Sequence, residues 1–296
     1  MHMVVSITND INIAEFLGKK GTEGNINFYN RTIEDNVLVS LFPQNIEKNI
    51  IPLAEAMLIS DIIIISTLNL DKLFGEIVIA ASLLDKHIIF TDDNDIKKFI
   101  TELNINNFEI TSKNELLNKI LNYKPNLDYS SARIDIDRAF PVKGVGTVAL
   151  GIVTKGIINV HDNLYHSNND MVSVRTLQVH DVDVEKVTPK MRVGISLKGI
   201  SYDQINSGDL LTSSKIQKVK EINTKIKSNL LTSNMLGKDI PYTLVSNFMH
   251  VNANLIKDEN NIKSFLLNKE CALDKGDRFL LIQNKVPRII ASGTII

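Results

Sequence analysis

Four glycines lie close together in the middle of the chain. In the stretch "DRAFPVKGVGTVALGIVTKGIINVHDNL", residues 137–164, they are Gly144, Gly146, Gly151 and Gly156. A glycine-rich loop can cradle a phosphate, but only between a strand and a helix whose free N–H groups face the anion. Here the following residues, "TVALGIV" and "GIINV", are rich in β-branched side chains and leave no room for a helix. The stretch therefore predicts strands that bend at glycine, as in a small closed barrel.

Two further groups of residues could bind a metal ion, and both have simpler structural explanations. Asp92, Asp93 and Asp95 could hold a divalent cation, but a solvated turn that caps the next helix explains them better. Three histidines of the predicted barrel lack the spacing of metal ligands and are expected at the surface or in turns. They are His161, His166 and His180. The sequence therefore predicts no metal site.

The composition is that of an ordinary globular protein. The chain has 296 residues, of which 44% are hydrophobic and 23% charged, enough for two or three domains that each bury a core. No apolar run is long enough to cross a bilayer, and residues 1–10 lack the pattern of a signal peptide. The single cysteine, Cys271, rules out an internal disulfide and is expected in a barrel core, so a cytoplasmic location is predicted.

The charge balance changes along the chain. Residues 1–132 hold 18 acidic and 11 basic side chains, residues 133–212 hold 9 of each, and residues 213–296 hold 7 acidic and 13 basic ones. The basic last part could face a polyanion such as RNA, or it could face the acidic first part. Both interpretations stay open at this point.

The first part of the chain alternates strands and helices. Expected strands, rich in isoleucine and valine, span residues 3–7, 36–42, 61–67, 87–92 and 107–112. Expected amphipathic helices span residues 11–21, 46–59, 75–86, 95–104 and 113–123. This alternation predicts a parallel sheet covered by helices on both faces, with ligands at the carboxyl ends of the strands.

The pattern changes after Tyr123. The connector "KPNLDYSSA", residues 124–132, leads into short strands with turn signals between them, which is typical of β-barrels or sandwiches. The segment "KIQKVKEINTKIKS", residues 215–228, is open between a strand and a basic helix, because its apolar residues also fit helical spacing. The chain beyond residue 133 is therefore expected to be mostly β.

Two long stretches resemble a known family. Residues 136–166, "IDRAFPVKGVGTVALGIVTKGIINVHDNLYH", and residues 172–212, which include "RVGISLKGI", resemble the second domain of the translational GTPases of the elongation factor Tu superfamily. The sequence of these stretches is most similar to that of the selenocysteine-specific elongation factors. The resemblance implies a degenerate P-loop-GTPase-like α/β domain over residues 1–124, a linker over 125–132, and two β-barrel domains over 133–212 and 213–296.

The segment that should bind nucleotide departs from the family. A translational GTPase needs G-x-x-x-x-G-K-[ST] after its first strand, because backbone N–H groups wrap the phosphates, lysine neutralises them and the hydroxyl holds Mg²⁺. The corresponding segment contains Thr8, Asn9, Asp10 and Asn12 but neither glycine nor lysine. The carboxylates of Asp10 and Glu15 would also repel phosphate.

Two more nucleotide-binding sequences are missing. The D-x-P-G position corresponds to residues 41–44, "LFPQ", which share only the proline. The N-K-x-D sequence that grips guanine is replaced by residues 91–95, "TDDND", and "TSK" at 111–113 carries almost no weight. We therefore expect the GTPase fold without its chemistry and without a cofactor. GTP and Mg²⁺ would bind only under the alternative that the chain is an active but divergent GTP-binding translation factor.

The first of the two expected barrels carries the sharpest candidate site. In the selenocysteine-specific factors the aminoacyl end of the tRNA enters a pocket lined by an Asp-Arg pair before "AF" and an arginine before "VG". The resemblance places Asp137, Arg138 and Arg192 at these positions. Arginine suits an anionic group such as a selenolate or a phosphoseryl side chain, because its guanidinium offers fixed donors and stays charged. A plainer interpretation is that Asp137 and Arg138 only pair with neighbours across a strand.

The basic segment of the third part offers candidates for RNA binding. They are Lys215, Lys218, Lys220, Lys225 and Lys227. With the pocket, they predict an elongation factor-like protein without GTPase activity that binds tRNA, aminoacylated or not, or the ribosome, and no membrane. A protein-interaction scaffold built on the same barrels is the remaining alternative.

Overall fold

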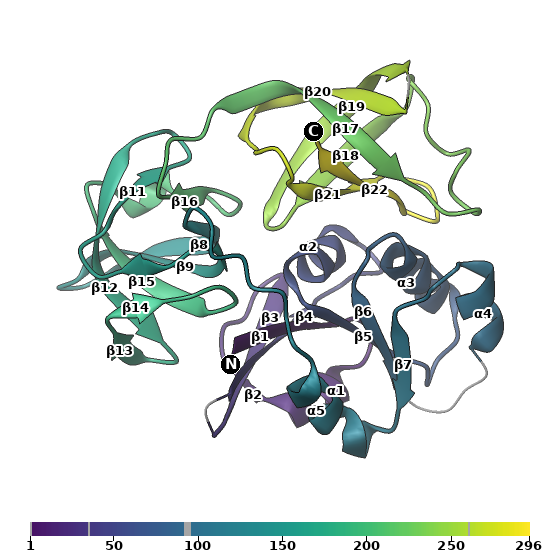
Figure 1. Cartoon of the computed structure of the whole chain (residues 1–296), viewed down its shortest axis with the longest axis horizontal. Helices are drawn as coiled ribbons and strands as arrows, with labels where there is room; N and C mark the ends of the chain where they lie inside the picture. The colour runs from purple at the N-terminus through teal and green to yellow at the C-terminus, as the bar shows by residue number, and fades with distance from the viewer. Residues whose placement is uncertain (1, 35, 92–95, 260) are drawn as a thin grey trace.

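The chain folds into an α/β part followed by two bodies of β-strands (Figure 1). The computed structural model describes residues 2–34, 36–91, 96–259 and 261–296. The predicted order of one α/β domain and two β-barrels is confirmed. Within the described ranges, no helix is long and apolar enough to span a membrane.

The first part is built around a sheet in the order β2-β3-β4-β1-β5-β6-β7. Strands β1, β4, β5, β6 and β7 run parallel, whereas β3 is antiparallel to β4 and β2 is antiparallel to β3. The strands are β1 (His2–Ile7), β2 (Lys19–Lys20), β3 (Ile26–Ile33), β4 (Asn36–Pro43), β5 (Ile62–Ser66), β6 (His87–Thr91) and β7 (Phe108–Thr111).

Helices cover both faces of this sheet. They are α1 (Ile11–Leu17), α2 (Ile51–Ile59), α3 (Lys72–Ser82), α4 (Lys97–Glu102) and α5 (Lys113–Asn122). One core joins α2 and α3 to Ile63 and Ile65 of β5, and the opposite core joins α1 and α5 to Ile62 and Ile64. The continuous isoleucine run of β5 is therefore explained by helices on each face, as predicted.

Several expectations about the first part are wrong. The second helix begins at Ile51 rather than at residue 46, and the third spans Lys72–Ser82 rather than 75–86. The first helix ends at Leu17 rather than at residue 21, because Gly18 caps it with an N–H bond to Ala14 O and the next two lysines form β2. The sheet is also not wholly parallel, because β3 adds an antiparallel strand. Its sequence "INFYNRTI" interrupts the apolar run with Asn30 and Arg31, so no continuous strand pattern marks it.

The second part is a barrel of antiparallel strands in the order β11-β16-β8-β9-β15-β12-β13, in which β11 also pairs with β12 and closes a ring that leaves β13 outside. Its elements are β8 (Arg133–Val142), β9 (Gly146–Lys155), β10 (Ile158–Asn159), β11 (Asn163–His166), β12 (Met171–Val179), β13 (Val182–Val184), β14 (Lys186–Val187), β15 (Arg192–Lys198), η1 (Tyr202–Gln204) and β16 (Leu210–Thr212). Gly144 and Gly146 have φ angles of 82° and 101°, values that favour glycine, at the turn before β9. The glycine-rich stretch thus forms turns and strands, as predicted.

The third part is a closed barrel in the order β17-β20-β19-β18-β21-β22. Its strands are β17 (Lys218–Lys227), β18 (Pro241–Ser246), β19 (Met249–Glu259), β20 (Ile262–Ala272), β21 (Arg278–Ile282) and β22 (Ile289–Ile295). The segment left open between strand and helix is therefore the strand β17, whose Ile222 and Thr224 are buried. Cys271 is buried in the core of this barrel, as predicted.

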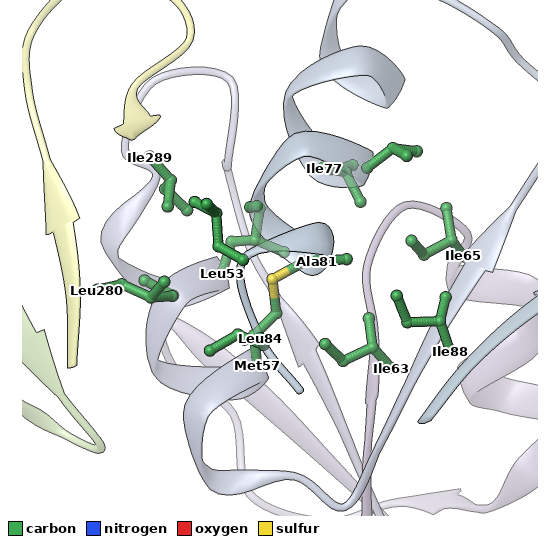
Figure 2. Close-up of a cluster of buried hydrophobic side chains, with 14 of the residues drawn as sticks. Leu53, Met57, Ile63, Ile65, Ile77, Ala81, Leu84, Ile88, Leu280 and Ile289 are labelled. Atoms are coloured by element: carbon green, nitrogen blue, oxygen red, sulfur yellow. The ribbon is translucent and has the colours of Figure 1, made fainter. Parts of the chain in front are cut away.

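The first and third parts share one hydrophobic core. Leu280 and Ile289 of the last barrel lie in the same buried cluster as Met57 of α2 (Figure 2). Beside this cluster, Arg288 Nη2 donates to Glu76 Oε2 of α3 at 2.7 Å. Apolar packing and an ion pair together hold the last barrel against α2 and α3.

A buried ion network joins the two barrels. Arg133 donates to the two carboxylate oxygens of Asp135 at 3.0 and 3.1 Å, and to those of Asp277 at 2.8 and 2.9 Å. The side chains of Arg133, Asp135 and Asp277 are 5%, 3% and 7% exposed. The guanidinium is thus neutralised by one carboxylate from each barrel.

Candidate functional site

The segment that takes the place of a phosphate-binding loop is short and internally bonded. Only three residues, Thr8 to Asp10, separate β1 from α1. Asp10 caps the helix, since its Oδ1 accepts the N–H of Asn12 at 2.9 Å. Asn9 is tied to the end of β5, because it donates to Ser66 O at 2.8 Å and accepts the Ser66 N–H at 2.9 Å. A carboxylate therefore stands where a phosphate would need free N–H groups.

The other positions expected to contact nucleotide lie at the carboxyl ends of strands. Pro43 ends β4, Thr111 ends β7, and Ser112 precedes α5. Residues 92–95, which replace the guanine-binding sequence and include the aspartates weighed as a cation site, lie outside the described residues. The loss of GTP binding therefore stays a prediction.

Arg192 is the most buried of the predicted pocket residues. It begins β15 and is 8% exposed, on a face of the strand that continues with Gly194 and Ser196. Its Nη2 donates to Asp137 Oδ2 at 2.9 Å, and its guanidinium carbon lies 3.3 Å from the centroid of the Phe28 ring. Burial lowers the pKa of Arg192, and Asp137 acts against this shift. The guanidinium stays charged at neutral pH.

Asp137 also contacts Arg138, and both arginines reach the connection between β2 and β3 of the first part. Arg138 Nε donates to Asp137 Oδ2 at 3.3 Å, and its Nη1 donates to Glu23 O at 2.8 Å. Arg192 Nη2 donates to Thr22 Oγ1 at 3.4 Å. The three predicted residues therefore lie together, at a contact between the first part and the barrel of the second part.

A cavity of about 1040 Å³ lies beside this contact. Its floor is the outer face of the barrel sheet, where Ser196 of β15 lies opposite Val148 of β9. Its wall is the edge strand β2 together with Asn30 of β3. Of the three predicted residues, Arg192 lines the cavity, whereas the side chains of the Asp-Arg pair hold Arg192 and the neighbouring segment from outside it.

Among the described residues that line this cavity, four have a buried side-chain atom without a hydrogen-bond partner. These atoms are Asn30 Oδ1, His180 Nε2, Arg192 Nη1 and Ser196 Oγ. Each such atom costs about 1–3 kcal/mol when it stays unpaired, so several in one cavity indicate a place for a polar ligand. The fixed positive charge among them favours an anionic group.

The three histidines have different environments. His161 is exposed in a turn, as predicted, with a φ angle of 74°. His166 is buried, contrary to the prediction, because its Nε2 bonds to Asp209 Oδ2 at 3.0 Å. His180 lies in the turn between β12 and β13, where no sequence signal marks it as part of a cavity. In the part of the chain that the structure describes, no group of three His, Cys, Asp or Glu side chains could hold a metal ion.

The predicted RNA-binding lysines follow β17 and the residues before it. Four are exposed and Lys218 is half-buried; the exposed ones are Lys215, Lys220, Lys225 and Lys227. Lys227 Nζ donates to Asp85 Oδ1 at 2.7 Å, and Lys218 Nζ donates to Asn168 Oδ1 at 2.5 Å. Lys215 Nζ also lies 5.7 Å from the centroid of the Tyr165 ring, so three of the five lysines contact another part of the protein.

The barrel of the second part matches a known family. Residues 146–212 fit the family model of elongation factor Tu domain 2. The chain is also 29% identical to the selenocysteine-specific elongation factor of Methanocaldococcus jannaschii, over 62% of this chain and 46% of that protein. The chain is related to the translational GTPase superfamily. This translational GTPase relative spans less than half of the length of that factor.

The translational GTPase relative resembles other proteins along nearly its whole length. It is 29% identical to an uncharacterized protein of Methanocaldococcus jannaschii over 96% of each chain. Translation elongation factor SelB of Methanococcus maripaludis, in complex with the GTP analogue GPPNHP, superposes with a TM-score of 0.83 at 22% identity, covering 99% of this chain and 78% of that one. A bacterial selenocysteine-specific elongation factor gives a TM-score of 0.84 at 16% identity, covering 99% and 58%. These structures confirm the predicted fold, and the relation supports a function like that of a translation factor.

Proposed function

We propose that this translation factor-like protein binds the acceptor end of an aminoacylated tRNA in the cytoplasm without using GTP. The aminoacyl group would occupy the cavity between the first part and the barrel of the second part. The observation that carries the proposal is Arg192, which is 8% exposed and keeps Nη1 unpaired in a cavity of about 1040 Å³. This arginine belongs to the barrel that matches elongation factor Tu domain 2.

The chemistry of the cavity favours an anionic aminoacyl side chain. Asp137 engages Nη2 of Arg192, whereas Nη1 has no hydrogen-bond partner among the described residues. A charged hydrogen bond in a site shielded from water is stronger than the same bond at the surface. A selenolate or a phosphoseryl group would gain this interaction, whereas a seryl hydroxyl would gain only a neutral bond. The cavity would therefore distinguish the charged forms of one tRNA.

The tRNA body would be held by the basic third part. Residues 213–296 carry 13 basic and 7 acidic side chains, and exposed lysines along β17 can contact phosphates without reading sequence. The loop between β1 and α1 lacks the glycines and the lysine that phosphates need, so nucleotide hydrolysis would not time the release of the tRNA. Release would instead depend on a partner such as the ribosome.

Protection of the aminoacyl ester tests this proposal. Spontaneous hydrolysis of phosphoseryl-tRNA is followed without GTP, with the native protein and with Arg192→Ala, Arg192→Lys and Lys198→Ala. Lys198 is an exposed residue at the end of the same strand, so its variant is the matched control. We expect the native protein and Lys198→Ala to protect the ester. Both Arg192 variants should lose this protection while they melt at the same temperature as the native protein.

Two results would contradict the proposal. Equal protection by the native protein and by Arg192→Lys would remove the fixed guanidinium fork from ligand recognition. The absence of any tRNA binding at low salt would leave the barrels as a scaffold for protein contacts.

A further inference from the structure

His180 lies in a two-residue turn beside the cavity. Val179 and Val182 are paired across the β12–β13 hairpin, and the two residues between them, His180 and Asp181, have φ angles of 52° and 63°. Two-residue hairpin turns with two positive φ angles most often contain Asn, Asp or Gly, and histidine is also among the side chains that adopt positive φ more readily than most. The turn therefore places His180 among the residues that line the cavity.

The imidazole faces charged groups from several elements. His2 of β1, Asp181 of its own turn and Arg192 of β15 are close enough to act on it electrostatically. The remaining charged residues of the same cavity are Lys19, Lys20 and Asp183. Burial lowers the pKa of His180, with Arg192 acting in the same direction and Asp181 against it. Burial also lowers the pKa of His2 to about 4, so both imidazoles are neutral at neutral pH.

We propose that His180 is a second recognition group for an anion bound at Arg192, and that it takes up a proton when the anion enters. This inference rests on the proposed function, which places an anionic group in the cavity. His180 Nε2 is buried without a partner in the same cavity as Arg192 Nη1. A neutral Nε2 that carries no proton can only accept a hydrogen bond, whereas a protonated ring donates from both nitrogens. An anion between the two side chains would therefore stabilise the charged imidazole.

The direction of the pH effect follows from linkage. The bound anion raises the affinity of His180 for its proton, so the protein with anion binds more protons than the protein without it. Anion affinity must then rise as the pH falls through the range where His180 titrates in the complex. A shift of one pKa unit corresponds to about a tenfold change in affinity.

Sulfate is a suitable probe because it carries no titrating proton in this range. Its affinity for the full chain is measured by calorimetry at about pH 5.5 and about pH 8, which bracket the titration of histidine. The variants are His180→Gln, His161→Gln as the exposed control in the same barrel, His2→Gln and Arg192→Ala. Nitrogen-15 spectra of the imidazoles report which ring gains the proton.

We expect sulfate to bind the native protein about tenfold more tightly at the lower pH. His180→Gln should remove most of this difference, whereas His161→Gln and His2→Gln should keep it, and Arg192→Ala should lose binding at both pH values. Equal affinity at the two pH values, or an unchanged pH dependence in His180→Gln, would overturn the role of His180 while leaving an Arg192 pocket. Sulfate that fails to bind at either pH would also overturn it, whereas the proposed tRNA function is decided separately by ester protection.

Discussion

Removing Arg133 should destabilise the protein far more than removing a surface cation. Arg133 makes four N–H···O contacts of 2.8 to 3.1 Å with Asp135 and Asp277, and all three side chains are almost wholly buried. Arg133→Met would keep an unbranched side chain but leave two buried carboxylates without a counter-charge. Breaking one side of a buried pair costs about 3–5 kcal/mol. For a protein of this size that free energy corresponds to a fall in Tm of about 6–20 °C.

Thermal melting and urea unfolding measure the loss, with two comparisons. The triple variant Arg133→Met, Asp135→Asn and Asp277→Asn removes the uncompensated charges, so it should recover most of the stability. Lys98→Met breaks an exposed pair with Glu102 and should leave the melting temperature unchanged. A loss below about 1 kcal/mol in Arg133→Met, the range of surface pairs, would refute the reasoning.

Three further predictions concern nucleotide, acid stability and RNA. No GTP or GDP should bind in the micromolar range with Mg²⁺, and calorimetry that gave stoichiometric binding abolished by Asp10→Ala would contradict this. Burial raises the pKa of Glu76, but hydrogen bonds from Arg288 outweigh burial and hold this pKa below its ordinary value. The Glu76–Arg288 pair therefore stabilises the fold above the unfolded pKa of about 4.3, and this stability is lost as the pH falls through the lower folded pKa. Glu76→Gln should flatten the dependence of the unfolding free energy on pH in this range. An unchanged pH dependence would argue against the contribution. Lys220→Ala and Lys225→Ala should weaken binding of any tRNA uniformly and reduce its salt dependence, measured by filter binding at two salt concentrations; a change in preference among tRNAs would count against a phosphate-only contact.

Sequence patterns predict most of the architecture because each part has its own periodicity. The run "IIIIS" of β5 can only be buried on both faces, and the short strands after residue 133 require a β fold. The strand β3 escapes prediction because Asn30 and Arg31 break its apolar pattern, and it is stabilised by pairing with β4 rather than by its own composition. Tertiary pairing decides such a segment.

The candidate site is also only partly predictable from the sequence. The motif around Asp137 and Arg192 marks the barrel side of the cavity, because those residues belong to a recognisable stretch of sequence. Nothing local marks the wall that the first part supplies, since Thr22 lies 170 residues before Arg192. No sequence pattern marks His180 either, because its place in the cavity depends on a two-residue turn and on the packing of the first part against the barrel.

The affinity for differently charged forms of one tRNA tests the central claim most directly. Seryl-, phosphoseryl- and selenocysteinyl-tRNA are compared at two salt concentrations, without GTP, for the native protein and for Arg192→Ala. The account predicts tighter binding of the two anionic forms, and a loss of about 2–5 kcal/mol for those forms in Arg192→Ala, the usual effect of truncating one partner of a buried charge pair. Equal affinities for all three charged forms, or no loss in Arg192→Ala, would contradict the claim that this cavity holds an anionic aminoacyl group.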